Sequence, residues 1–187
     1  MQTDVAAYVS HNEQRERIRS FVLDALLRLA SRTDVGRIII NAHSNGTVIA
    51  YDVLRQLPLY ARQKVAAFVT AGSPLRKYVT LFRWGRDIES DFALTTWLNF
   101  WDEHDPIADP LEPPLSWRRE TTIPPKGPQL FQRVDPYTGE QFDVEVEDIQ
   151  VDNLRYSQRG GLQAHNYWDN ERQFVLPLVK LLLPPIP

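Results

Sequence analysis

A serine between small residues is the first candidate for chemistry in this sequence. Residues 38–50 read IIINAHSNGTVIA, with Ala42 two positions before Ser44 and Gly46 two positions after it. The apolar residues before the serine predict a strand, and those after it predict a helix. A turn that joins a strand directly to a helix exposes its serine and requires small neighbours, so that strand and helix can approach. The pattern favours Ser44 as a nucleophile over the alternative of an ordinary loop serine.

A serine hydroxyl is a weak nucleophile at neutral pH, so Ser44 requires a base, and the base requires an acid that orients it. The sequence offers four histidines: His11, His43, His104 and His165. His43 is adjacent to Ser44, and we expect its side chain to point away from that of the serine. His165 lies after a Gly-Gly pair and before the last predicted helix, from where it can reach the carboxyl edge of a sheet. A plain loop histidine is the alternative interpretation of His165.

Acidic residues follow the third predicted strand: Asp102, Glu103, Asp105 and Asp109. Asp105 is followed by Pro106, and a proline fixes the turn that would hold the carboxylate in place. We therefore select Asp105 as the acid. His104 stands within the same cluster, so a carboxylate-rich metal site is an alternative, although acidic clusters at strand exits are usually solvated loops.

Hydrophobic patterns predict the elements that position these residues. Apolar residues recur at helical spacing over residues 13–30, and three continuous apolar runs predict strands that are covered on both faces. The three predicted strands are Arg37–Ala42, Val65–Val69 and Thr96–Trp101. The other predicted elements are a helix over 46–57, a short strand at Asp148–Asn153 and a final helix from about Glu171. Strands that alternate with helices at this spacing predict an α/β fold, with a mostly parallel sheet flanked by helices.

Two segments depart from this alternation. Residues 106–128 hold seven of the fourteen prolines, which predicts an extended loop. Residues 130–146 contain two short strand-like runs around a turn, which predicts a β-hairpin on the surface.

A chain of 187 residues is long enough for one compact domain and too short for two ordinary ones. We therefore expect a single domain over residues 1–187 with two excursions.

The chain resembles the α/β-hydrolase superfamily, in particular its serine lipases and esterases. Four segments carry the resemblance, in the order found in that fold: AHSNGTVIAYDVL, FVTAGSPLRKY, WLNFWDEHDPIADPL and AHNYW. The resemblance implies that Ser44 is the nucleophile, Asp105 the acid and His165 the base. It implies that the backbone N–H of Asn45 donates to the oxyanion. It also implies cleavage of a carboxylic ester or thioester of a small molecule or lipid, with no cofactor and no metal.

Two departures from the superfamily pattern are visible. Ala42 stands where glycine is usual, and only one predicted helix precedes the nucleophile strand. Members of the superfamily have several earlier strands, and a loop after one of them gives the second oxyanion donor. We therefore expect a sheet that is truncated at one side. The alternatives are that the sequence is a fragment, that an upstream domain or self-association completes the sheet, or that the chain is a minimal member of the superfamily. A catalytically weak or inactive hydrolase-like interaction module within a larger protein is the alternative function.

Composition argues against several other classes. The net charge is −3 with acidic and basic residues interspersed, so no nucleic-acid surface is expected. The sequence has no cysteine, which excludes disulfides, a thiolate nucleophile and cysteine-bound metal. The N-terminal MQTDVAAYVSHNEQ lacks the layout of a signal peptide, and the apolar FVLPLVKLLLPPIP is too short to span a bilayer. We therefore expect no transmembrane segment and a cytoplasmic location.

Overall fold

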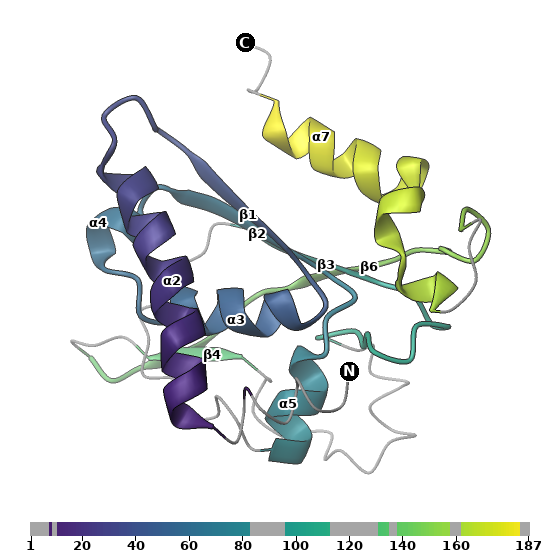
Figure 1. Cartoon of the computed structure of the whole chain (residues 1–187), viewed down its shortest axis with the longest axis horizontal. Helices are drawn as coiled ribbons and strands as arrows, with labels where there is room; N and C mark the ends of the chain where they lie inside the picture. The colour runs from purple at the N-terminus through teal and green to yellow at the C-terminus, as the bar shows by residue number, and fades with distance from the viewer. Residues whose placement is uncertain are drawn as a thin grey trace.

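A sheet of four parallel strands forms the centre of the computed structural model (Figure 1). The structure describes Tyr8 and residues 11–82, 96–112, 131–134, 138–157 and 162–183. The strands are β1 (Ile38–His43), β2 (Val65–Ala71), β3 (Trp97–Trp101) and β6 (Glu147–Gln150), in the order β1-β2-β3-β6. Each neighbouring pair is parallel. The α/β fold predicted from the sequence is confirmed.

The strand register brings the carboxyl ends of β1, β2 and β3 to one edge of the sheet. His43 pairs with Ala71, and Ala71 pairs with Phe100. Beyond the paired residues, the Ser44 N–H donates to the Ala71 carbonyl at 3.0 Å, and the Gly72 N–H donates to the Phe100 carbonyl at 3.2 Å. The loops that follow these three strands therefore begin beside one another.

Apolar side chains cover the sheet on both faces. Phe68 and Val69 are neighbours on β2 and are fully buried, but they belong to two different clusters. Successive side chains of a strand point to opposite faces, so β1, β2 and β3 each supply both clusters, and β6 contributes Ile149 to the second. This explains why the strands read as continuous apolar runs in the sequence.

Helices pack against each face. The first cluster contains residues of α2 (Asn12–Ser31), α3 (Asn45–Leu54), α4 (Leu59–Arg62) and α5 (Leu75–Phe82). The second contains residues of the 3-10 turn η2 (Tyr167–Asp169), the π-helical turn η3 (Glu171–Val175) and α7 (Leu176–Leu182), which follow a further 3-10 turn, η1 (Gln163–His165). The predicted final helix thus starts as a π-turn, and α3 ends three residues before the predicted end.

The predicted hairpin is formed by β4 (Gln132–Val134) and β5 (Gln141–Asp143), which pair antiparallel. The segments beside it lie only partly on the surface: Glu145 is exposed, but Phe131, Val144 and Val146 are buried in the first cluster. The Phe131 ring centroid lies 4.8 Å from that of Trp97 on β3. Burial of these apolar side chains therefore attaches the hairpin to the core. Of the predicted proline-rich loop, residues 113–128 lie outside the described residues.

The helices of the described ranges include none that combines the length and the apolar character needed to cross a membrane.

Candidate active site

Ser44 occupies the turn between β1 and α3 in a strained backbone conformation. Its φ is 55° and its ψ is −133°, and no other non-glycine residue in the described part of the chain has a positive φ. Side chains other than glycine rarely adopt such a φ, so surrounding contacts must hold it. Two hydrogen bonds from Thr47 do so, since its N–H and its Oγ1 donate to the Ser44 carbonyl at 3.0 and 2.7 Å.

The first turn of α3 is tied to the loop after β2. Thr47 Oγ1 lies 2.9 Å from Ser73 Oγ, and both side chains are fully buried. The sequence predicts close packing at Gly46, but the structure does not show it. A Cβ added at Gly46 would have no described heavy atom within 4 Å, apart from its chain neighbours and the backbone of its own helix. The turn is therefore fixed by hydrogen bonds across the sheet edge, and Gly46 is not required there for close packing.

Asp105 and His165 are brought together from positions far apart in the sequence. His165 Nδ1 lies 2.7 Å from Asp105 Oδ2, and the Tyr167 hydroxyl donates to the same oxygen at 3.1 Å. Asp105 Oδ1 accepts the Ile107 N–H at 2.9 Å. The carboxylate is fully buried, whereas the His165 side chain is 10% exposed. Burial alone would raise the pKa of Asp105, but the bonds from His165, Ile107 and Tyr167 hold that pKa below its ordinary value.

The loop after Asp105 is fixed by partners from other elements. Lys77 on α5 donates to the Ile107 carbonyl at 2.9 Å and pairs with Asp109 at 2.7 Å. Asp148 on β6 accepts the Leu111 N–H at 2.9 Å. These contacts hold the loop in place in addition to the turn expected at Pro106. The carboxylate of Asp109 forms an ion pair with Lys77.

Asp102, the other buried acid after β3, has different partners. Its Oδ2 accepts the Asn153 N–H at 2.6 Å, which links the ends of β3 and β6. Its Oδ1 accepts the His104 N–H at 2.8 Å, and the His104 ring is 56% exposed. No three histidine, aspartate or glutamate side chains of the described residues converge as metal ligands would. The carboxylates of Asp102 and Asp105 are each committed to separate hydrogen bonds.

Ser44 is connected to the Asp105–His165 pair through the end of β2. The Ser44 N–H bonds to Ala71, and the next residue, Gly72, lies directly against the histidine ring. A Cβ on Gly72 would lie 2.7 Å from His165 Cε1, and its φ is +60°. Only glycine suits this position, because any side chain would strain the backbone and displace the ring. Ser44, Asp105 and His165 therefore lie at the same carboxyl edge of the sheet.

A sequence model of the family described as "alpha/beta hydrolase of unknown function (DUF900)" matches residues 1–95. The chain belongs to this family. The matched region includes Ser44, whereas Asp105 and His165 lie beyond it. No curated protein and no solved structure matches the chain. Family membership thus supports the α/β-hydrolase relationship that the sequence motifs indicate, and the roles of individual residues depend on the geometry of the site.

Three residues that contact Asp105 or His165 were not predicted from the sequence: Gly72, Tyr167 and His43. His43 Nε2 lies 3.0 Å from the His165 carbonyl oxygen, and the two imidazole centroids are 4.5 Å apart. Because a carbonyl can only accept, His43 Nε2 carries the hydrogen. Burial, and secondarily the neighbouring His165, lower the pKa of His43, which favours its neutral form. Its position next to Ser44 was the one available signal.

Asn45 is the first residue of α3 and follows Ser44 directly. Its side-chain Oδ1 accepts the Tyr78 hydroxyl at 3.4 Å. The first N–H groups of a helix have no partner within the helix, and the helix dipole places partial positive charge at this end. The first turn of α3 carries no acidic residue that would neutralise this charge. The end of α3 beside Ser44 is therefore suited to an anion.

Proposed function

We propose that this chain is a serine hydrolase that cleaves a carboxylic ester or thioester. Ser44 is the nucleophile, His165 the general base and Asp105 the acid that orients the histidine. The observation that carries the proposal is the buried 2.7 Å hydrogen bond between Asp105 and His165. It lies at the same sheet edge as the strained Ser44 turn. Membership in an α/β-hydrolase family supports a hydrolytic reaction.

The hydrogen bond to Asp105 determines which proton His165 can take. With Nδ1 donating to the carboxylate, the neutral ring has its lone pair on Nε2. In the proposed reaction, Nε2 takes the Ser44 hydroxyl proton as the oxygen attacks the substrate carbonyl carbon. The imidazolium then gives this proton to the leaving alcohol or thiol. A water molecule, deprotonated in the same way, breaks the acyl–serine bond and restores the enzyme.

The proposed stabilisation of the oxyanion comes from Asn45. Its backbone N–H and the positive end of the α3 dipole favour the negative charge that develops on the carbonyl oxygen. We assign one donor, and removal of one such donor from a complete site costs roughly 10²–10³ in rate.

The direct test is Ser44→Ala, assayed with a fluorophosphonate probe and with p-nitrophenyl esters. Labelling and turnover should both vanish while the circular dichroism spectrum is retained. His165→Ala should lose nearly as much turnover, because residues that act as a unit do not contribute additively. Ser20→Ala on α2 is the matched control, since it removes an exposed serine. Undiminished turnover in Ser44→Ala would refute the assignment.

A second test separates this reaction from a metal-dependent one. Acyl transfer by a serine, a histidine and an aspartate needs no metal ion, so EDTA should leave turnover unchanged. Activity that is lost in EDTA and restored by a divalent cation would instead favour a metal site in the acidic segment after β3.

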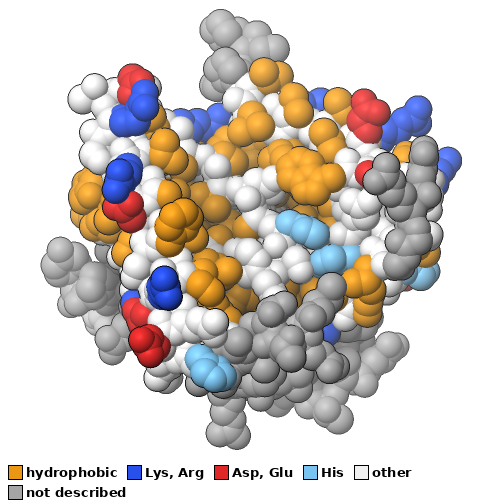
Figure 2. All heavy atoms as spheres, in the orientation of Figure 1, with side chains coloured by type: hydrophobic (Ala, Val, Ile, Leu, Met, Phe, Trp, Pro, Cys, Tyr) orange, Lys and Arg blue, Asp and Glu red, His pale blue; other side chains and the backbone are white. Residues whose placement is uncertain are grey.

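The outer side of β1 favours a second candidate function, that of a hydrolase-like interaction module. Among the described strands, β1 has a neighbour on one side only. Phe21 on α2 is 78% exposed and Leu182 on α7 is 56% exposed. Figure 2 shows apolar side chains gathered on the face to which α2 and α7 contribute. A strand edge with no described neighbour, near helices that expose apolar side chains, is a surface on which a further strand or chain can pair.

A further inference from the structure

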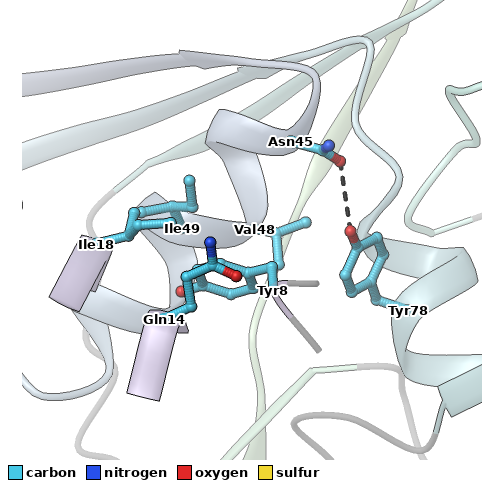
Figure 3. Close-up of a pocket in the computed structure, with 7 residues that line it drawn as sticks. All are labelled: Tyr8, Gln14, Ile18, Asn45, Val48, Ile49 and Tyr78. Atoms are coloured by element: carbon cyan, nitrogen blue, oxygen red, sulfur yellow. Dashed lines mark hydrogen bonds between the residues drawn. The ribbon is translucent and has the colours of Figure 1, made fainter. Parts of the chain in front are cut away.

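A cavity of about 190 Å³ lies beside the first turn of α3. Three aliphatic side chains line it: Ile18 from α2, with Val48 and Ile49 from α3. Asn45, which follows Ser44 in the sequence, is also part of the lining, and Figure 3 shows it at the start of α3. The cavity is thus lined by side chains of α2 and α3, among them the residue that follows the proposed nucleophile in the sequence.

The two tyrosines of the lining have their hydroxyls bonded within the protein. Tyr8 donates to Asp52 at 3.0 Å. Tyr78 donates to Asn45 at 3.4 Å, as Figure 3 shows. Burial raises the pKa of Tyr78 to about 12, so its hydroxyl stays neutral. The tyrosines therefore present mainly ring carbon to the cavity, together with the three aliphatic residues, and Gln14 adds one amide. This lining suits a hydrocarbon chain better than a charged or sugar-like group.

We propose that this cavity binds the acyl chain of the substrate and limits it to short chains. The inference rests on the proposed acylation of Ser44. An apolar cavity of about 150 Å³ is known to hold benzene, a six-carbon molecule. A cavity of about 190 Å³ then holds about six to eight carbon atoms. The substrate class is accordingly esters or thioesters of short aliphatic acids, and carbon atoms beyond about the eighth gain no further burial in the cavity.

The test measures kcat/KM of the full chain on p-nitrophenyl esters from acetate to decanoate. Each methylene buried in the cavity should raise kcat/KM about fourfold. The rise should stop between hexanoate and octanoate, where the cavity is full. A profile that is flat with chain length, or that rises through decanoate, would overturn the proposal.

Ile18→Trp is the variant that tests the location of the acyl chain. Ile18 is 38% exposed, so a larger side chain can be accommodated without repacking the core. The indole should occupy the cavity and lower the hexanoate-to-acetate ratio of kcat/KM at least tenfold. Leu29→Trp is the matched control, because Leu29 is also on α2, is 44% exposed and does not line the cavity. An equal ratio in the two variants would place the acyl chain elsewhere.

A binding measurement distinguishes failure of the cavity from failure of the nucleophile. Hexanoate binding to Ser44→Ala can be followed by saturation-transfer NMR, which requires no turnover. Binding that is retained with Leu29→Trp and lost with Ile18→Trp supports the cavity even if Ser44 proves not to be the nucleophile. If turnover depends on Ser44 but Ile18→Trp does not change hexanoate binding, the proposed function stands and the acyl site is refuted.

Discussion

The carboxyl edge of the sheet and the outer side of β1 differ in how completely their side chains are partnered. At the carboxyl edge, Asp105 is fully buried and accepts three hydrogen bonds. On the outer side of β1, Asn41 is exposed and the flanking helices expose Phe21 and Leu182. At the carboxyl edge, both oxygens of the Asp105 carboxylate accept hydrogen bonds. Beside β1, apolar side chains remain in contact with solvent.

This difference indicates which property each region controls. Buried polar groups are costly unless they are paired, so a change at the carboxyl edge disturbs a defined geometry. Exposed apolar groups constrain no geometry, but they favour association. Variants at the carboxyl edge should therefore lose rate, and variants beside β1 should change association.

Among the variants that test this comparison, the largest effect is expected from Asp105→Asn. Replacing the acid of such a triad by its amide costs roughly 10⁴ in rate, because the imidazole is left in the wrong tautomer. Asp102→Asn removes an acid that is equally buried but bonded to Asn153 and His104, so it should lower the thermal midpoint more than the rate. Steady-state turnover and thermal unfolding of both variants test the assignment. The reverse ranking in rate would transfer the acid role to Asp102.

The contact between Gly72 and His165 gives the next prediction. Gly72→Ala would place a Cβ 2.7 Å from His165 Cε1, which must displace the ring. A misplacement of about 1 Å can cost about 10² in rate. Gly139→Ala is the control, because its φ of +70° gives similar backbone strain while its Cβ meets no described atom within 4 Å. Both variants should lose stability, but only Gly72→Ala should lose turnover; equal rates would contradict the contact.

Tyr167→Phe tests the remaining bond to Asp105. Removing the hydroxyl should lower turnover about tenfold, as expected for a hydrogen bond to a charged group. It should also raise the pKa of Asp105, because the Tyr167 bond helps to hold that pKa below its ordinary value. Tyr60→Phe on α4, where the ring is exposed, is the control.

The pH dependence of stability follows from the direction of that shift. The lowered pKa of Asp105 contributes stability that is complete above its unfolded-state pKa and is lost as the pH falls through its folded-state pKa. With Tyr167→Phe the folded-state pKa moves closer to the unfolded-state pKa, so the loss on acidification should be smaller and should be complete at higher pH than in the parent chain. Thermal midpoints measured between about pH 3 and pH 7 test this. Parallel curves for the variant and the parent would mean that the Tyr167 bond does not influence Asp105.

The strands and the sheet edge could be predicted from the sequence because their signals are local. The continuous apolar runs reflect burial on both faces, and parallel strands place their exits together. Residues Ser44, Asp105 and His165 follow from motifs in these exits, and their catalytic roles stay predictions. The short strand β6 carries charged residues, so its boundaries were less visible.

The contacts among side chains could not be predicted, because they join segments that are distant in the sequence. Nothing local distinguishes Gly72, which lies against His165, from Gly46, where a Cβ would have room. The bond from His43 to the His165 carbonyl spans 122 positions. Such contacts depend on the register of the strands and on the path of the loop before η1, which hydrophobic periodicity does not specify.

The smallest effect on turnover is expected beside β1, where the measured property is association. We expect the chain to self-associate through the edge of β1 that has no neighbour among the described strands, together with the exposed apolar side chains of α2 and α7. Leu182→Asp should shift sedimentation toward the monomer and leave turnover per mole of chain unchanged, because a charge resists burial between copies. Leu154→Asp is the matched control, since Leu154 is 42% exposed and lies after β6, the opposite edge strand. A parent chain that is monomeric at all concentrations, or an equal shift in both variants, would show that the β1 side does not direct association.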